Sequence, residues 1–140
     1  MQVERVLSLT QEQIQQFNAS FPDQNWDVQH CVRFFSDPKN ILLFCFDSTE
    51  IVGFVIAYKL DRLDSKNAEV LLYEVETKST KRRQGIGKLL FVELKKIAKE
   101  SGAHEIWVLT SKTNEAAVKY YLSQGAQTET VEDIMYVFPL

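Results

Sequence analysis

The hydrophobic pattern of residues 68–100 changes its period once, and this change constrains the fold of the chain more than any other feature. The first part is an apolar, strand-like run that ends in two carboxylates, Glu74 and Glu76. From Gly85 onward, apolar residues recur at the spacing of a helix. The predicted strand therefore passes into an amphipathic helix through a turn that holds Gly85 and Gly87. Such a turn can direct backbone N–H groups and the positive end of the helix toward an anion, usually a phosphate.

The turn between this strand and helix is strongly basic. No acid stands between Glu76 and Glu93, and the interval holds five cations, Lys78, Lys81, Arg82, Arg83 and Lys88. The whole chain nevertheless has a net charge of −3 and a pI near 5.4. Proteins that bind duplex nucleic acid normally present a basic face, so this balance disfavours nucleic acid as a partner. The clustered cations favour a compact polyphosphate, and the acidic remainder favours a cationic substrate.

The totals predict one soluble globular domain over residues 1–140, with 45% hydrophobic and 25% charged residues. No apolar run approaches the roughly 20 residues of a membrane-spanning helix, and the first residues show no signal-peptide pattern. We interpret Cys31 and Cys45 as reduced cysteines of a cytoplasmic protein. His30 and His104 have no ligand spacing to each other or to the cysteines, so no metal site is expected.

The order of the expected elements predicts an α/β fold. Helices are expected at 10–20, 26–35, 85–100 and 114–124, and strands at 3–7, 41–46, 51–58, 68–77, 105–110, 126–131 and 134–138. Thr10 and Gln13 form a capping-box sequence, and Gly125 is suited to close the last helix. This order predicts a mixed, mostly antiparallel sheet of six to seven strands flanked by about four helices.

The glycine turn differs from the two common phosphate-binding sequences. Residues 82–87 fit R-x-x-G-x-G. A Walker loop would need glycine at Arg82 and serine or threonine at Leu89, and a dinucleotide fingerprint would need a small residue at Leu90. Taken alone, the hexapeptide is equally consistent with a basic helix start that binds nothing.

A second motif further along the chain helps to interpret the glycine turn. Asn114, Ala117, Tyr121 and Gly125 follow the pattern N-x-x-A-x-x-x-Y-x-x-x-G. With the strand, basic turn and helix, they resemble the GNAT superfamily of acetyl-coenzyme A-dependent N-acetyltransferases, from about residue 41 to the end of the chain. The sequence is most similar to the aminoglycoside 3-N-acetyltransferases, although Ala126 stands where that family often has phenylalanine.

This resemblance implies where acetyl-coenzyme A binds. Backbone groups of residues 75–77 would pair with the pantetheine arm like an added strand, and amides of residues 83–88 would hold the pyrophosphate. The implied cofactor-binding set is Val75, Glu76, Thr77, Arg82, Arg83, Gln84, Gly85, Ile86, Gly87, Lys88 and Asn114. The sequence does not choose which of the side chains Lys78, Lys81 and Arg82 reaches the adenosine phosphate.

Two carboxylates compete for the role of base. An alkylammonium with a pKa near 10.4 must lose its proton before attack, which costs roughly 4–5 kcal/mol at neutral pH. Burial and a neighbouring carboxylate both raise a carboxyl pKa toward a useful range. Glu74 lies deeper than Glu76 and matches the acidic position of the family, so we expect Glu74 to be the base, with Glu76 as the alternative. Strand alternation puts both on the face of Val70 and Leu72 unless a bulge intervenes.

Departure of the thiolate calls for an acid, because the parent thiol has a pKa of about 8.5. The resemblance assigns this role to Tyr121, whose phenol can protonate the sulfur. Neighbouring Tyr120 fits ordinary core packing. No serine or cysteine has an identifiable histidine partner, so a covalent acyl-enzyme is disfavoured.

The acceptor is the least determined partner. The resemblance suggests a small polycationic amine, above all an aminoglycoside, which would connect the chain with antibiotic resistance. Glu129, Glu132 and Asp133 are candidate substrate-binding acids, or else an ordinary solvated turn. The alternatives are acetylation of a protein N-terminus or lysine, and a non-catalytic module that binds acyl-coenzyme A. The resemblance also leaves a homodimer open.

Overall fold

The computed structural model describes residues 1–140, which form two compact units, Met1–Leu109 and Thr110–Leu140. The first unit contains β1 (Gln2–Val6), α1 (Gln11–Ser20), α2 (Val28–Phe35), β2 (Asn40–Asp47), β3 (Glu50–Leu60), β4 (Ala68–Thr77), the 3-10 helix η1 (Ser79–Lys81), α3 (Ile86–Glu100) and β5 (Ala103–Trp107). The second unit contains one helix, α4 (Glu115–Ser123). None of these helices has the length and apolar character that crossing a bilayer requires.

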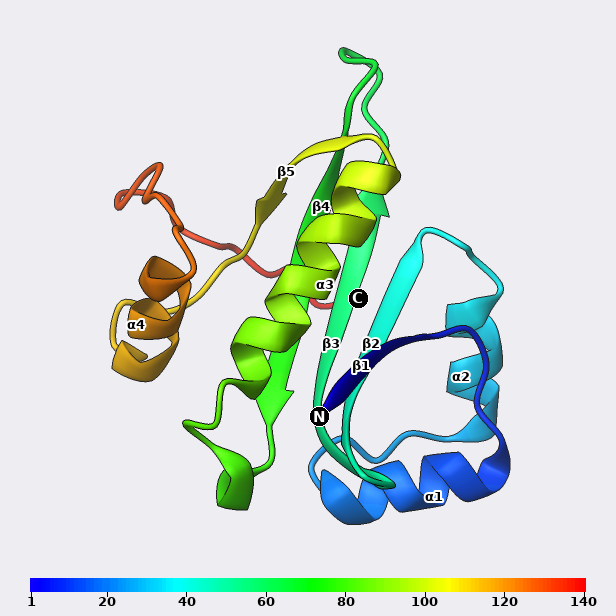
Figure 1. Ribbon diagram of the computed structural model, residues 1–140. Coiled ribbons are helices and arrows are strands. Elements are labelled where there is room, and N and C mark those ends of the chain that lie inside the picture. The colour runs from blue at the N-terminus through cyan, green and yellow to red at the C-terminus, as the bar shows by residue number, and fades with distance from the viewer. The chain divides into compact units, whose positions relative to one another are not determined.

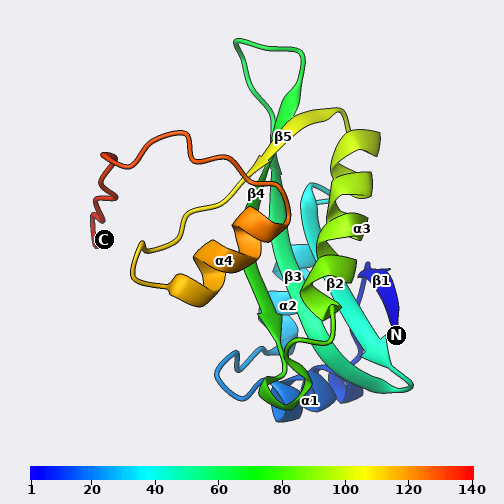
Figure 2. The ribbon, with the colours of Figure 1, turned by 60° about the vertical axis from the view of Figure 1, so that its left-hand side comes forward.

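One sheet organises the first unit (Figure 1). Its five strands lie in the order β1-β2-β3-β4-β5. The first three pairs are antiparallel, and β4 pairs with β5 in parallel. The predicted mixed sheet is confirmed, but it has five strands and not six to seven. Figure 2 shows β5 at the edge of the sheet.

The two missing strands are those predicted at 126–131 and 134–138, where the structure has no strand. Their apolar and polar residues suit a strand, but a strand forms only where a neighbour satisfies its backbone hydrogen bonds. Nothing pairs with this segment, and its apolar side chains stay in solvent, with Ile134 71% and Phe138 84% exposed. The sequence pattern therefore indicated a capacity for pairing without supplying the partner.

The helix starts follow from local chemistry. The Thr10 side chain accepts a hydrogen bond from the Gln13 N–H at 3.2 Å, and the Gln13 side chain accepts one from the Thr10 N–H at 2.9 Å. This confirms the predicted capping box. The side chain of Asp27 caps α2 in a similar way, accepting from the His30 N–H at 2.9 Å. Gly125, with φ of 89°, follows α4 in the left-handed conformation expected there.

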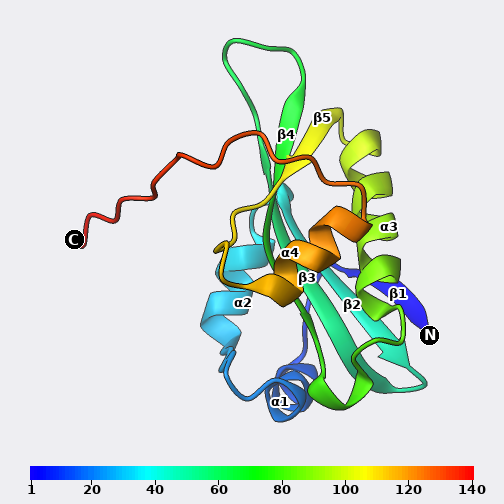
Figure 3. The same ribbon diagram turned by 90° about the vertical axis from the view of Figure 1, so that its left-hand side faces the viewer.

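Helices α1 and α2 cover one face of the sheet, where aromatic side chains form the core (Figure 3). Phe17 of α1 is fully buried at its centre. Its ring centroid lies 3.8 Å from that of Trp26 and 5.3 Å from that of Phe44, both stacked, and 5.1 Å from that of Phe54, edge to face. Such aromatic pairs stabilise a core beyond the area they bury.

Helix α3 covers the opposite face (Figure 3). Its side chains Ile86, Leu90 and Leu94 are almost completely buried. The helix approaches β3 so closely that a Cβ atom built on Gly53 would lie 2.6 Å from Cγ2 of Ile86. Only glycine fits that point of the sheet without displacing the helix.

Candidate active site

A bulge in β4 decides which way the two candidate bases point. Glu74 lies opposite Ile56 on β3, and Leu72 lies opposite Ala57, so Tyr73 is left without a partner. The extra residue reverses the alternation beyond it. Glu74 and Glu76 therefore share a face, as predicted, but it is the face that carries α1 and α2, opposite to the one that Leu72 occupies.

Gln24, in the segment between α1 and α2, joins the two carboxylates. Its side-chain Nε2 donates to Oε1 of Glu74 at 2.7 Å and lies 3.4 Å from Oε2 of Glu76. The side-chain oxygen of Gln24 accepts a hydrogen bond from Nε1 of Trp26 at 3.3 Å. No sequence pattern indicated this residue, because 50 residues separate it from Glu74. We call Glu74 and Glu76 the carboxylate pair, and Gln24 the bridge between them.

The Glu76 carboxyl differs electrostatically from a side chain at a solvated strand end. Burial raises the pKa of the Glu76 carboxyl, and the charge of Glu74 raises it further, while the hydrogen bond from Gln24 acts in the opposite direction. Both side chains are half-buried. The raised pKa makes proton uptake by the Glu76 carboxyl easier than at an exposed glutamate.

Strands β4 and β5 separate just before β4 reaches the carboxylate pair. Their pairing ends with Leu71 opposite Trp107, so residues 72–77 of β4 have a strand neighbour only on the β3 side. At this point, Nε1 of Trp107 is buried without a hydrogen-bond partner. The predicted pantetheine-pairing residues, Val75, Glu76 and Thr77, all lie on this stretch of β4. An extended ligand placed along that edge would find backbone groups to pair with.

The turn before α3 has the conformation expected of an anion cradle. Arg83 and Gly85 have positive φ values, 62° and 80°, and Gly85 is the residue that precedes the helix. No side chain caps the start of α3. A helix start without a side-chain cap suits an anion that accepts hydrogen bonds from backbone N–H groups.

The five cations of the turn divide into two groups. Lys78 forms an ion pair with Glu50, and Lys81 forms one with Asp47 at 2.8 Å, which fastens the turn to the β2–β3 hairpin. The other three are exposed and form no ion pair: Arg82, Arg83 and Lys88. Of the three side chains left open for the adenosine phosphate, Arg82 alone forms no ion pair, although its charge lowers the pKa of the Glu76 carboxyl.

The remaining predicted residues belong to the second unit. Asn114 caps α4, its side chain accepting a hydrogen bond from the Ala117 N–H at 3.1 Å, so helix capping by itself explains the N-x-x-A spacing. Tyr120 and Tyr121 are half-buried, with ring centroids 5.1 Å apart, and burial raises the pKa of the Tyr121 phenol. Tyr121 is therefore neutral at neutral pH, and its role as proton donor stays a prediction. The acids Glu129, Glu132 and Asp133 are all exposed.

One cluster of metal-ligand residue types appears that the sequence did not indicate. Glu69, His104 and Glu105 offer atoms within 4.8 Å of one another. Glu69 is already paired with Arg62, and Nδ1 of His104 lies 3.0 Å from the carbonyl oxygen of Ala68. Local contacts of the protein account for this cluster.

Cys31 and Cys45 are both free and buried.

Solved structures with the same fold include acetyltransferases of two kinds. An aminoglycoside acetyltransferase, meta-AAC0020 from an uncultured soil metagenomic sample, crystallised with sisomicin, has a TM-score of 0.80 at 22% identity, covering 99% of this chain and 96% of that one. Aminoglycoside N-acetyltransferase AAC(6')-Iy in complex with CoA has a TM-score of 0.79 at 14% identity, covering 99% and 100%. The ribosomal-protein-alanine N-acetyltransferase of Brucella melitensis biovar Abortus 2308 has a TM-score of 0.74 at 19% identity, covering 97% and 100%.

At these identities the structural likeness establishes the fold. A search of curated protein sequences gave no match. The sequence itself matches the acetyltransferase (GNAT) family over residues 6–126, which include β2 to β5, the basic turn and α4. Because this match spans most of the chain, the protein belongs to the acetyltransferase (GNAT) family.

Proposed function

We propose that the protein transfers the acetyl group of acetyl-coenzyme A to a primary amine, by direct attack of the amine within a ternary complex. The observation that carries this proposal is the arrangement around β4. An uncapped, basic helix start follows the strand, one edge of the strand lacks a neighbour, and a bridged carboxylate pair lies on one face. These are the parts needed to hold a diphosphate, an extended thiol arm and an ammonium ion.

The residues present suit coenzyme A. Backbone N–H groups at residues 83–88 would hold the pyrophosphate, and the exposed cations Arg82, Arg83 and Lys88 would add charge. Main-chain groups of residues 75–77 would pair with the pantetheine arm, with Asn114 at its far end. Bound in this way, the thioester supplies an activated acyl group, and the N–H near Val75 would polarise its carbonyl.

Glu74 would receive the proton of the acceptor ammonium, directly or through water. It accepts the shorter of the two hydrogen bonds from Gln24, 2.7 Å against 3.4 Å, which supports it as the more firmly positioned of the two carboxylates. Glu76, with its raised pKa, would hold a proton to higher pH than an exposed glutamate does. Tyr121 would donate its phenolic proton to the departing thiolate.

The experiment is a thiol-release assay with acetyl-coenzyme A and a panel of amines, using Glu74→Gln and Tyr121→Phe. Loss of a general base or acid lowers the rate by about 100-fold or more. Glu4→Gln and Tyr136→Phe, at exposed positions, are matched controls and should keep full activity. Full activity in both test variants would contradict the assigned chemistry.

The panel also separates the rival functions. Aminoglycosides and small polyamines belong in it because one structural neighbour was crystallised with sisomicin. A peptide with a free N-terminus belongs in it because another neighbour is a ribosomal-protein-alanine N-acetyltransferase. Calorimetric binding of coenzyme A without turnover of any amine would identify the protein as a non-catalytic module.

A further inference from the structure

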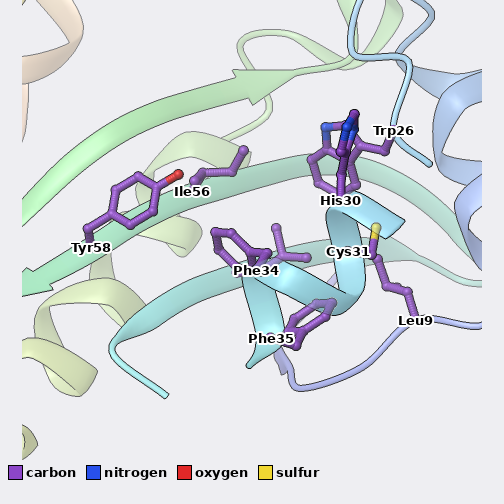
Figure 4. A pocket seen from close by; sticks show the side chains of 9 residues that line it. Leu9, Trp26, His30, Cys31, Phe34, Phe35, Ile56 and Tyr58 are labelled. Carbon is purple, nitrogen blue, oxygen red and sulfur yellow. The ribbon is translucent and has the colours of Figure 1, made fainter. Parts of the chain in front are cut away.

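An apolar pocket lies beside the carboxylate pair, between α2 and the β2–β3 part of the sheet. Its volume is about 120 Å³. Aromatic and aliphatic groups make up most of its lining, among them Trp26, Cys31, Phe34, Ile56 and Tyr58, and His30 also lines it (Figure 4). We call the first five side chains and the space between them the aromatic pocket. All of them belong to the first unit.

The walls of the pocket are fixed by the packing around it. Trp26 is stacked on the buried ring of Phe17 at 3.8 Å. The ring of Phe34 meets that of Tyr58 edge to face, with centroids 5.9 Å apart. Cys31 and Phe34 are three residues apart on α2, and so they lie on the same side of the helix. A preformed pocket of this kind binds a ligand without first reordering its walls.

The pocket and the carboxylate pair meet at one end. Trp26, in its wall, donates through Nε1 to the side-chain oxygen of Gln24, which in turn donates to Glu74. Ile56, also in the wall, is the cross-strand partner of Glu74. The charge of Glu74 contributes to raising the pKa of the Tyr58 phenol, after burial and the neighbouring Tyr73. A ligand that fills the pocket therefore has its polar end at the carboxylates.

The size and lining of the pocket select the ligand. A dry cavity of about 150 Å³ lined by aliphatic and aromatic side chains takes up benzene, so a volume of about 120 Å³ suits a single ring or a short alkyl chain. A hydroxylated sugar ring placed there would lose hydrogen bonds to water with few partners in exchange, which is unfavourable. An apolar group gains free energy in proportion to the area it buries.

We infer that the acceptor is a small primary amine with one apolar arm, whose ring or alkyl group enters the aromatic pocket while its ammonium meets Glu74 and Glu76. This inference rests on the proposed function and narrows its substrate class. The ammonium loses one proton to Glu74 and then to solvent. The amine nitrogen forms the bond to the acetyl carbonyl carbon as the carbon–sulfur bond breaks. After attack, the nitrogen loses a second proton and the departing thiolate takes up one proton, so the protons balance.

Binding is tested first, without turnover. The chain has two tryptophans, so Trp107→Phe leaves Trp26 as the only one. In that variant, phenethylamine should change the Trp26 fluorescence saturably, with an apparent affinity about tenfold or more above that of ethylamine. An equal response to both amines, or none to phenethylamine, overturns the inference.

Turnover is tested with a variant that fills the pocket. Cys31→Leu adds volume inside it, and Val32→Leu, at a neighbouring residue that is 62% exposed, is the matched control. Cys31→Leu should lower kcat/KM for phenethylamine about tenfold relative to ethylamine and leave coenzyme A affinity unchanged, whereas Val32→Leu should change neither. If Cys31→Leu fails to fold, protection of Cys31 from alkylation by phenethylamine, and not by ethylamine, gives the same information in the native chain.

The outcomes separate the two proposals. A preference of tenfold or more for kanamycin, or for a peptide N-terminus, over phenethylamine overturns the inference and leaves acetyl transfer standing. Binding of phenethylamine at Trp26 without acetylation of any amine overturns the proposed function, and the acceptor role with it. Acetylation of phenethylamine in preference to ethylamine, lost in Cys31→Leu, supports both.

Discussion

Gln24 supplies a side-chain amide donor that Glu74 and Glu76 share. Its amide contacts Glu74 and Glu76, and its oxygen accepts the indole proton of Trp26. One side chain thereby connects the proposed base to the wall of the aromatic pocket. A neutral bridge suits this position, since a cation there would hold both carboxylates ionised and weaken their ability to take up a proton.

Removing this bridge should shift the pH profile of the enzyme. The hydrogen bond from Gln24 lowers the pKa of Glu76, so Gln24→Ala should raise the pKa of Glu76. Because a hydrogen bond to a charged group contributes about 1.5–3 kcal/mol, the acidic limb of kcat/KM should move to higher pH by about one unit. The control is Gln16→Ala, which removes a bond to the backbone oxygen of Thr49 only. An unshifted profile would show that the pair does not set the rate.

At the scale of elements, the basic turn is attached to the β2–β3 hairpin by ion pairs and continues directly into α3. Lys78 and Lys81 pair with acids of the β2–β3 hairpin, while Gly85 turns the chain into α3. The predicted run of five cations is therefore two structural residues followed by three that are available to an anion. The pKa of Lys81 is raised through its hydrogen bond and charge interaction with Asp47, which keeps this lysine charged and occupied.

This division predicts unequal effects on coenzyme A binding. Arg82→Met should weaken binding several-fold, since it removes an unpaired cation beside the proposed pyrophosphate site. Lys81→Met removes a cation that Asp47 already compensates, and it should weaken binding less. Calorimetric titration with coenzyme A at low and high salt measures the difference, which should shrink as salt increases. A larger effect at Lys81 would contradict the division.

Close packing of β3 against α3 positions the start of the helix, which follows the basic turn. A Cβ atom at Gly53 would lie 2.6 Å from Ile86, the first residue of α3, and 3.1 Å from the backbone oxygen of Glu76. Gly53→Ala should therefore lower the free energy of unfolding by about 1–3 kcal/mol through overpacking. Urea unfolding measures this loss. Wild-type stability in the variant would show that α3 can move away without cost.

At the scale of the whole molecule, the buried core belongs to one part of the chain. Every hydrophobic residue with almost no exposed surface lies between Ile14 and Ala98. A chain that ends at Leu109 should therefore unfold cooperatively in urea, with a sharp transition, while it lacks Tyr121 and should not transfer acetyl groups. The full chain is the reference. A broad, non-cooperative transition would show that residues 110–140 are needed for the core to form.

The sequence predicted the elements whose signals are local. The helix that follows Gly85 has a strong apolar period, and the start of α1 has its capping box, so both were predicted within a residue or so. The strands at 126–131 and 134–138 were wrong, because pairing needs a partner that composition does not specify. Gln24 was missed because its contact with Glu74 spans 50 residues and depends on the path between two helices.

The bulge at Tyr73 has a consequence for how such a site arises. On one side of it, β4 packs apolar side chains beneath α3, and on the other side the same strand presents carboxylates to the opposite face. If β4 ran past this point without the bulge, with Tyr73 paired in strict alternation, the two charged groups would share the face of Leu72, in the hydrocarbon layer under the helix. The difference between a strand that only fills space and one that can handle protons is thus one residue left out of the ladder.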